Sequence, residues 1–117
     1  MRTTVLIVDD HDGFRARARA LLETEGFEVV GDAADGRSGL VAAERLRPEV
    51  ALVDVGLPDI DGFAVAAEIR RTGLARKVIL ISGRARDDFG ERITGSLADG
   101  FIAKAELCGE HLAEALE

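Results

Sequence analysis

The sequence of 117 residues contains no tryptophan, no tyrosine, two prolines and a single cysteine, Cys108. One cysteine cannot form an internal disulfide, and no apolar run approaches the roughly 20 residues needed to span a bilayer. No small-residue cleavage site follows the first apolar stretch, so we expect no secretory signal and a cytoplasmic location. The net charge of −7 argues against direct contact with nucleic acid, which requires a basic surface.

What the sequence does contain is typical of a globular protein. Hydrophobic residues make up 47% and charged residues 32%, which is enough apolar material for a packed core. No internal repeat or low-complexity linker divides the chain, so we expect residues 1–117 to form one domain. Arginine outnumbers lysine by 13 to 2, which makes Lys77 and Lys104 stand out.

Short β-branched runs alternate with longer stretches of helical period, the pattern of βα units and a parallel sheet. Strands are expected at residues 5–8, 27–30, 50–54, 78–81 and 100–103. Helices are expected at residues 13–25, 38–47, 63–69, 86–94 and 106–116. Asp35 is the expected N-cap of the second helix, and Cys108 is expected to pack inside the last one. Gly90 and Gly95 weaken the fourth helix, which we expect to be short or mobile.

Polar side chains stand where four of these strands end, and ligands of open parallel sheets bind beyond the carboxyl ends of the strands. These residues are Asp9 and Asp10, Asp54, Ser82 and Lys104. Three carboxylates at one edge repel one another unless a cation lies among them. Mg²⁺ fits this role, because it accepts a few carboxylates and keeps waters that a phosphate oxygen can replace. An ammonium and a hydroxyl beside it would complete a clamp for a phosphoryl group.

The order and spacing of these residues resemble the receiver domain of two-component response regulators over essentially the whole chain. The matching segments are LIVDD at 6–10, DVGLPDIDG at 54–62, SG at 82–83, and ADGF at 98–101 leading to Lys104. The resemblance implies a doubly wound, flavodoxin-like three-layer fold, with five parallel strands in the order 2-1-3-4-5 and five helices. The opening segments resemble receivers that precede helix-turn-helix DNA-binding domains. Both a stand-alone regulator and a receiver taken from a longer protein fit the sequence.

The resemblance also implies roles for individual residues. Asp54 would accept a phosphoryl group from a sensor histidine kinase or a phosphotransfer protein. Mg²⁺ would be held by Asp9, Asp10, Asp54 and the carbonyl of Gly56, and Lys104 would neutralise phosphoryl oxygens. Such a domain is a phosphorylated switch that contributes to its own phosphorylation and dephosphorylation, not a turnover enzyme.

The remaining implied roles concern the signal and its lifetime. Ser82 would hydrogen-bond the attached phosphoryl group, while Phe101 would turn inward and change the surface of residues 86–116, which controls an output and could form a homodimer. Arg84, two positions past Ser82, flanks the expected path of the attacking water and should affect the phosphoryl lifetime. Ala105 stands where many family members have proline, so a cis peptide there would cost about 3 kcal/mol.

Three other classes of function stay open at this point. An aspartyl-phosphate phosphatase would need an acid two residues after its nucleophile, where this chain has Gly56. A flavodoxin-like cofactor binder would need a phosphate loop after the first strand and usually aromatic flavin stackers. The third class is an interaction module of the same fold that works without phosphorylation.

Overall fold

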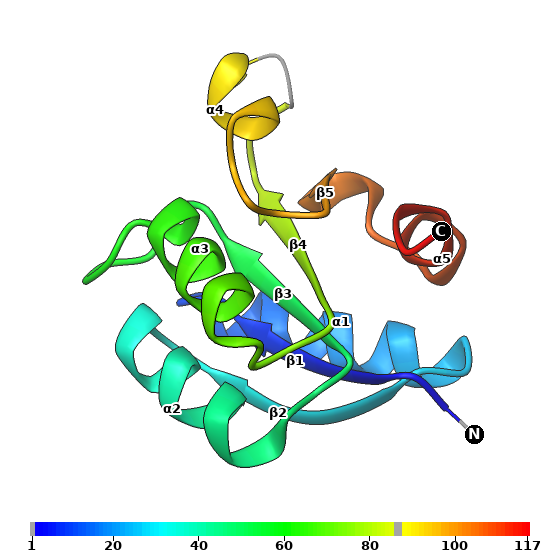
Figure 1. Ribbon diagram of the computed structural model, residues 1–117. Helices are drawn as coiled ribbons and strands as arrows, with labels where there is room; N and C mark the ends of the chain where they lie inside the picture. The colour runs from blue at the N-terminus through cyan, green and yellow to red at the C-terminus, as the bar shows by residue number, and fades with distance from the viewer. Residues whose placement is uncertain (1, 86–87) are drawn as a thin grey trace.

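A parallel sheet of five strands lies at the centre of the computed structural model, which describes residues 2–85 and 88–117 (Figure 1). The strand order is β2-β1-β3-β4-β5. The strands are β1 Thr4–Val8, β2 Glu28–Ala33, β3 Val50–Asp54, β4 Lys77–Ser82 and β5 Gly100–Ala103. The helices are α1 Asp12–Thr24, α2 Gly36–Leu46, α3 Gly62–Thr72, α4 Glu91–Thr94 and α5 Gly109–Ala115. The predicted fold class and strand order are confirmed.

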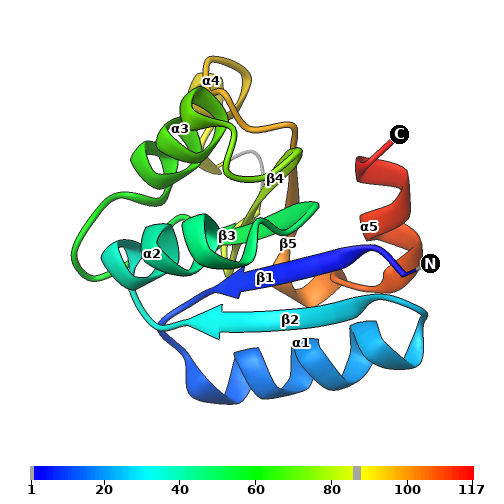
Figure 2. The ribbon, with the colours of Figure 1, turned by 60° about the horizontal axis from the view of Figure 1, so that its bottom comes forward.

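Helices cover both faces of the sheet, which gives three layers (Figure 2). On one face, Leu6, Val8 and Val53 pack against α2 and α3. On the other face, Ile7 and Leu52 belong to a second cluster that also contains buried residues of α1 and α5. Alternate residues of the same strand therefore enter different clusters, because successive side chains of a strand point to opposite faces. This double burial explains why the central strands read as continuous apolar runs.

The fourth helix is the shortest of the α-helices in the described residues. Residues 86–94 were expected to be helical, of which 86–87 lie outside the described residues. The regular helix α4 has four residues, and its N-cap, Gly90, has a φ of 52°, a conformation that suits glycine and does not continue a helix. The prediction of a short helix is confirmed, and its mobility stays a prediction.

The last helix begins at Gly109, so the predicted start at residue 106 is wrong. Leu107 has extended backbone and is buried in the second cluster, and this conformation interrupts the expected helix. Cys108 is the N-cap of α5, where its Sγ accepts a hydrogen bond from the His111 amide at 3.4 Å, so its expected place inside the helix is also wrong. The amide of Gly109 donates to Glu25 Oε2 at 3.0 Å, which fixes the start of α5 against the end of α1.

Two aspartates hold the loop of residues 55–61 that follows β3. Asp61 caps α3 by accepting a hydrogen bond from the Phe63 amide at 2.7 Å. Asp59 accepts hydrogen bonds from the amides of Gly36 (2.7 Å) and Arg37 (2.9 Å) at the start of α2. The loop is thereby tied to two helices, which limits the freedom of the chain directly after Asp54.

Gly62 lies against the main chain at the end of β3. Its amide donates to the Val55 carbonyl at 3.0 Å. A Cβ at position 62 would lie 2.1 Å from the carbonyl oxygen of Asp54, a contact that only a shift of the backbone could relieve. The close approach of α3 to the end of β3 therefore depends on glycine.

We predict that Gly62→Ala destabilises the protein by at least the 1–3 kcal/mol that is typical of overpacking, because the clash is with rigid main chain. Thermal and urea unfolding measure this change. Gly56→Ala is the matched control, since a Cβ there meets nothing within 4 Å. Equal stability of Gly62→Ala and Gly56→Ala would contradict the prediction.

Candidate functional site

The carboxyl edge of the sheet brings together the residues that the sequence analysis placed at strand ends. Asp9 and Asp10 follow β1, Asp54 ends β3, and Lys104 follows β5. Carboxylate oxygens of Asp9, Asp10 and Asp54 all lie within 4.8 Å of one another. The predicted acidic pocket therefore forms: Asp54 from β3 lies beside Asp9 and Asp10, which follow the neighbouring strand β1.

Asp9 is fully buried, and its contacts come from several directions. Its Oδ1 accepts a hydrogen bond from the His11 amide at 2.8 Å, and its own amide donates to the Ala33 carbonyl at 3.0 Å. Its Oδ2 lies 2.5 Å from Nζ of Lys104 as an ion pair. Apart from this ion pair, Oδ2 has no hydrogen-bond partner within the described residues, so one of its lone pairs is left for a second cation.

Asp54 is also buried, with 6% of its surface exposed. Its Oδ1 accepts a hydrogen bond from the Gly56 amide at 3.3 Å, and its Oδ2 lies 3.6 Å from Lys104 Nζ. Burial raises the pKa of Asp54 above its ordinary value; the Lys104 ammonium opposes this rise, and the Asp9 carboxylate adds to it.

The positive charge in the pocket does not balance the negative charge. Lys104 is the ammonium paired with Asp9 and Asp54, and it also lies 4.7 Å from the centre of the Phe14 ring. With all groups ionised, three carboxylates and one ammonium leave a formal charge of −2. A hard divalent cation with oxygen ligands would offset this charge, so the residues present fit such an ion.

The peptide bond after Lys104 has the ordinary trans conformation. No peptide bond in the described residues is cis, so the Lys104–Ala105 bond is trans. Residues 104–106 form a single turn of 3₁₀-helix. Lys104 therefore reaches the pocket from this turn without a cis peptide bond, although alanine stands at position 105 in place of proline.

Ser82 and Arg84 lie at the end of β4, beside the pocket. Ser82 is buried, and its Oγ accepts a hydrogen bond from the Arg84 amide at 3.0 Å. Within residues 2–85 and 88–117 the Ser82 hydroxyl donates no hydrogen bond, so its hydrogen is free to bind an oxygen ligand. The side chain of Arg84 is exposed.

Phe101 pairs with Leu80 of β4 and lies on the same face of the sheet as Leu80, where it begins a row of aromatic rings. It is partly buried, and its ring centre lies 5.7 Å from that of Phe89. Phe89 in turn contacts Phe63 of α3 edge to face, at 6.0 Å. The role predicted for Phe101 concerns a motion, and it stays a prediction.

Three contributors were not predicted from the sequence. Arg15 contacts the main chain of Asp9, Asp59 holds the loop after Asp54, and Phe89 packs on Phe101. Asp59 and Arg15 carried a usable signal, since the first stands in a loop before a helix and the second lies within two helical turns of the acid pair. Phe89 carried none, because a Phe in an irregular segment has no periodicity to place it.

The helices can also be checked for the length and composition of a membrane-spanning segment. Among the described helices, none combines the length and the apolar character that crossing a membrane requires.

We predict that two aspartates affect stability with opposite dependence on pH when divalent cations are removed by a chelator. The folded state raises the pKa of Asp54 above 3.8, so it binds this proton more tightly than the unfolded state does. The stability that the protonated form contributes is therefore lost as pH rises through the folded pKa. Asp54→Asn should have a higher Tm than the wild type at pH 7, and the difference should shrink towards pH 4.

Asp59 provides the contrast, because hydrogen bonds from the Arg37 and Gly36 amides lower its pKa. Its ionised form stabilises the fold, and this contribution is lost as pH falls through the folded pKa. Asp59→Asn should therefore lower the Tm at pH 7 and approach the wild type in acid. Thermal unfolding of the three proteins between pH 4 and pH 7 tests both signs, and a lower Tm of Asp54→Asn at pH 7 would contradict the first.

Comparison with known proteins agrees with the geometry of this pocket. The family model of the response regulator receiver domain matches residues 5–117. The positive transcription regulator of virulence factors BvgA of Bordetella pertussis is 39% identical over 106 residues, which cover 91% of this chain and 51% of BvgA. The response regulator GacA of Pseudomonas protegens is 36% identical over 101 residues, which cover 86% of this chain and 47% of GacA.

A solved structure gives the same answer for the fold. The signal receiver domain of NarL from Mycobacterium tuberculosis has a TM-score of 0.83 and 32% identity, with 98% of this chain and 97% of that chain covered. The chain spans about half the length of the curated relatives BvgA and GacA. With its order of strands, its acidic pocket and a family match over 113 of its 117 residues, the chain belongs to the response regulator receiver domain family.

Proposed function

We propose that this receiver domain is switched by phosphorylation of Asp54. The observation that carries the proposal is the convergence of Asp9, Asp10 and Asp54 with Lys104, whose Nζ lies 2.5 Å from Asp9 and 3.6 Å from Asp54. A buried carboxylate between an ammonium and two further carboxylates has the surroundings that a phosphoryl acceptor needs, once a divalent cation offsets the excess negative charge.

The cation we propose is Mg²⁺, held by Asp9, Asp10, Asp54 and the carbonyl of Gly56. When bound, Mg²⁺ would supply positive charge to the phosphoryl oxygens. Asp9 is suited to it because, in the described part of the chain, its buried Oδ2 is paired with Lys104 alone and keeps a lone pair for the cation. Asp10 is exposed, so it leaves the site open to solvent and to a phosphoryl donor.

The chain's own residues position the transfer. An Asp54 carboxylate oxygen would attack the phosphorus of a phosphohistidine, and the bond from phosphorus to the donor nitrogen would break. That nitrogen keeps the electron pair, and Asp54 becomes an acyl phosphate. Lys104, which lies 3.6 Å from Asp54 Oδ2, would pair with one phosphoryl oxygen, and the Ser82 hydroxyl would donate a hydrogen bond to another. In hydrolysis, water attacks phosphorus and the Asp54 carboxylate leaves.

The signal would pass from Ser82 to Phe101. A donated hydrogen bond draws Ser82 towards the phosphoryl group and changes the space beside β5 into which Phe101 can turn. Because Phe101 packs on Phe89, its motion would also displace the segment that leads to α4. The surface formed by α4, β5 and α5 is therefore the proposed output surface, and homodimer formation through it stays a prediction.

The family and its relatives support a proposal for the phosphoryl donor and for the output. A sensor histidine kinase or a phosphotransfer protein in the cytoplasm would supply the phosphoryl group. BvgA and GacA are about twice as long as this chain, and BvgA is a transcription regulator by name. We propose a role in transcription control in which DNA is contacted by another domain or partner, because this chain has a net charge of −7.

The direct test is the intact mass of the protein after incubation with acetyl phosphate. We expect a single phosphoryl adduct in the wild type that requires Mg²⁺ and is absent from Asp54→Asn, since Asn has no carboxylate to attack phosphorus. Asp35→Asn is the matched control and should be phosphorylated normally, because Asp35 caps α2 outside the pocket and asparagine is an equally good N-cap. No adduct on the folded wild type would favour a module that works without phosphorylation.

We predict that Arg84→Ala changes the lifetime of the phosphoryl group. The Arg84 amide is bound to the Ser82 hydroxyl, so its exposed guanidinium emerges beside the proposed path of water. Decay of the adduct after removal of acetyl phosphate measures the lifetime. Arg76→Ala, which removes an exposed arginine from the opposite end of β4, is the control. An Arg84→Ala rate equal to that of the wild type would contradict the prediction.

A further inference from the structure

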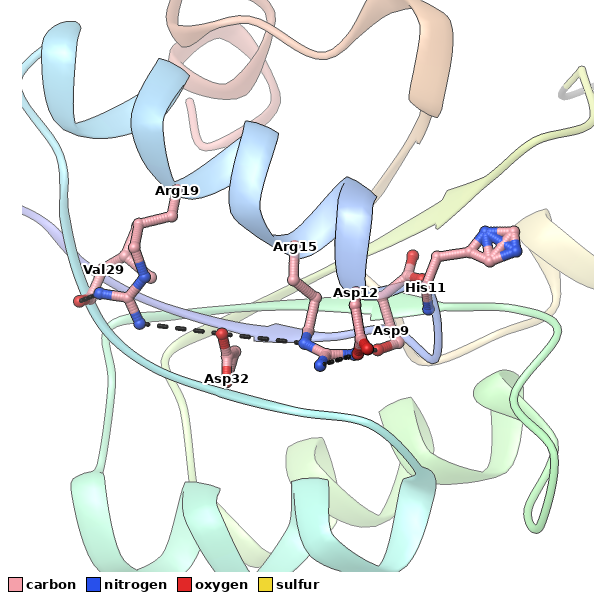
Figure 3. A network of polar contacts seen from close by, with 7 residues as sticks. All are labelled: Asp9, His11, Asp12, Arg15, Arg19, Val29 and Asp32. Carbon is pink, nitrogen blue, oxygen red and sulfur yellow. Dashed lines mark hydrogen bonds and ion pairs between the residues drawn. The ribbon is translucent and has the colours of Figure 1, made fainter.

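A network of charged side chains lies between α1 and β2 and reaches Asp9 of the acidic pocket (Figure 3). Arg15 points from α1 towards the end of β1, where its Nη1 donates to the main-chain carbonyl of Asp9 at 2.6 Å. Its Nη2 is paired with Asp12, and its Nε lies 3.8 Å from Asp32. Arg15 thus connects the backbone of the pocket to two acids that lie outside it.

The guanidinium of Arg15 is held in an unusually enclosed position for an arginine. Only 15% of its side chain is exposed, and within the described residues its buried Nε has no hydrogen-bond partner. Burying a cation is costly unless its partners compensate. The two acids and the Asp9 carbonyl provide this compensation, and they fix the guanidinium in one place.

The Asp9 carbonyl depends on such a donor because it lies beyond the last residue of β1. The Asp9 amide is still bound to Ala33 of β2, and the Asp9 Oδ1 accepts from the His11 amide. Arg15 supplies the hydrogen bond to the carbonyl at the point where the chain turns into α1. Together these bonds fix the main chain on both sides of the Asp9 side chain, and the carbonyl of Asp9 belongs to the peptide unit that leads to Asp10.

We propose that Arg15 is a positioning residue for the cation site: by holding the Asp9 carbonyl, it sets the backbone from which Asp9 and Asp10 present their carboxylates. This inference rests on the proposed function, since it concerns the proposed Mg²⁺ ligands. Partners that orient the ligands of a metal commonly change metal affinity 10- to 100-fold when they are lost.

Arg19 provides a matched control in the same network. It lies one turn further along α1, its Nη2 is 3.8 Å from the same Asp32, and its Nη1 donates to the Val29 carbonyl at 3.1 Å. Arg15→Gln and Arg19→Gln therefore each remove one positive charge that faces Asp32. Of these two arginines, only Arg15 donates a hydrogen bond to Asp9. If charge alone mattered, both variants would bind a cation more tightly than the wild type.

The experiment is a Mg²⁺ titration of the wild type, Arg15→Gln and Arg19→Gln, followed by ¹H–¹⁵N chemical shifts. We expect Arg15→Gln to bind Mg²⁺ roughly tenfold more weakly and Arg19→Gln to stay within about twofold of the wild type. In the metal-free proteins, the His11 amide that is bonded to Asp9 should shift in Arg15→Gln and not in Arg19→Gln. Wild-type or tighter Mg²⁺ binding by folded Arg15→Gln, or equal weakening by both variants, would overturn the proposal.

Three further variants keep the test decisive. If Arg15→Gln does not fold, Arg15→Lys and Arg19→Lys replace the pair, since lysine keeps the charge and loses the planar fork that reaches several partners at once. Weaker binding by Arg15→Lys alone supports positioning, and equal affinities overturn it. Asp54→Asn separates this inference from the proposed function: if the wild type does not bind Mg²⁺, or if Asp54→Asn binds it equally well, the proposed cation site itself is wrong.

Discussion

The crowding of three carboxylates at one edge of a parallel sheet is the constraint on which the rest of this structure depends. The topology enforces it, because β1 and β3 are neighbours and end at the same edge, so Asp9, Asp10 and Asp54 must meet. Repulsion among them is reduced by one ammonium, which Lys104 brings from the far strand β5. The carboxyl edge is therefore an energetically unfavourable arrangement that the surrounding fold maintains and that a divalent cation would relieve.

The backbone around the pocket shows how the fold maintains it. Gly62 lets the start of α3 approach the Asp54 carbonyl closely, and Asp59 binds the following loop to the first amides of α2. The pKa values of Asp54 and Asp59 shift in opposite directions, because the two carboxylates have different surroundings. Burial makes the charged form of Asp54 less favourable, whereas amide hydrogen bonds make the charged form of Asp59 more favourable. On the proposed function, Asp54 is kept for phosphoryl transfer at a cost in stability, whereas Asp59 stabilises its surroundings.

How much of this was accessible from the sequence depended on the range of the interactions involved. The sheet and the acidic pocket were predictable, because local periodicity identifies the strands and parallel strands bring their carboxyl ends together. The start of α5 was not, since it depends on Glu25, which is 84 residues away from Gly109 along the chain and binds its amide. The contact of Arg15 with the Asp9 carbonyl was missed because arginines on a helix surface usually face solvent, and only the packing of α1 against β2 shows that this one is enclosed.

If the proposed function is correct, contacts between aromatic rings carry a change in the pocket to the surface of the protein. Phe89 lies between Phe63 of α3 and Phe101 of β5, so Phe101 cannot turn without changing the surroundings of Phe89. Arg92 extends this contact, because it lies over the Phe63 ring at 4.3 Å and pairs with Asp61, the N-cap of α3, at 2.7 Å. A helix of four residues has few internal hydrogen bonds to lose. Rearrangement of α4 is therefore opposed by these side-chain contacts, together with the buried Ile93, and the contacts tie the proposed output surface to the loop that follows Asp54.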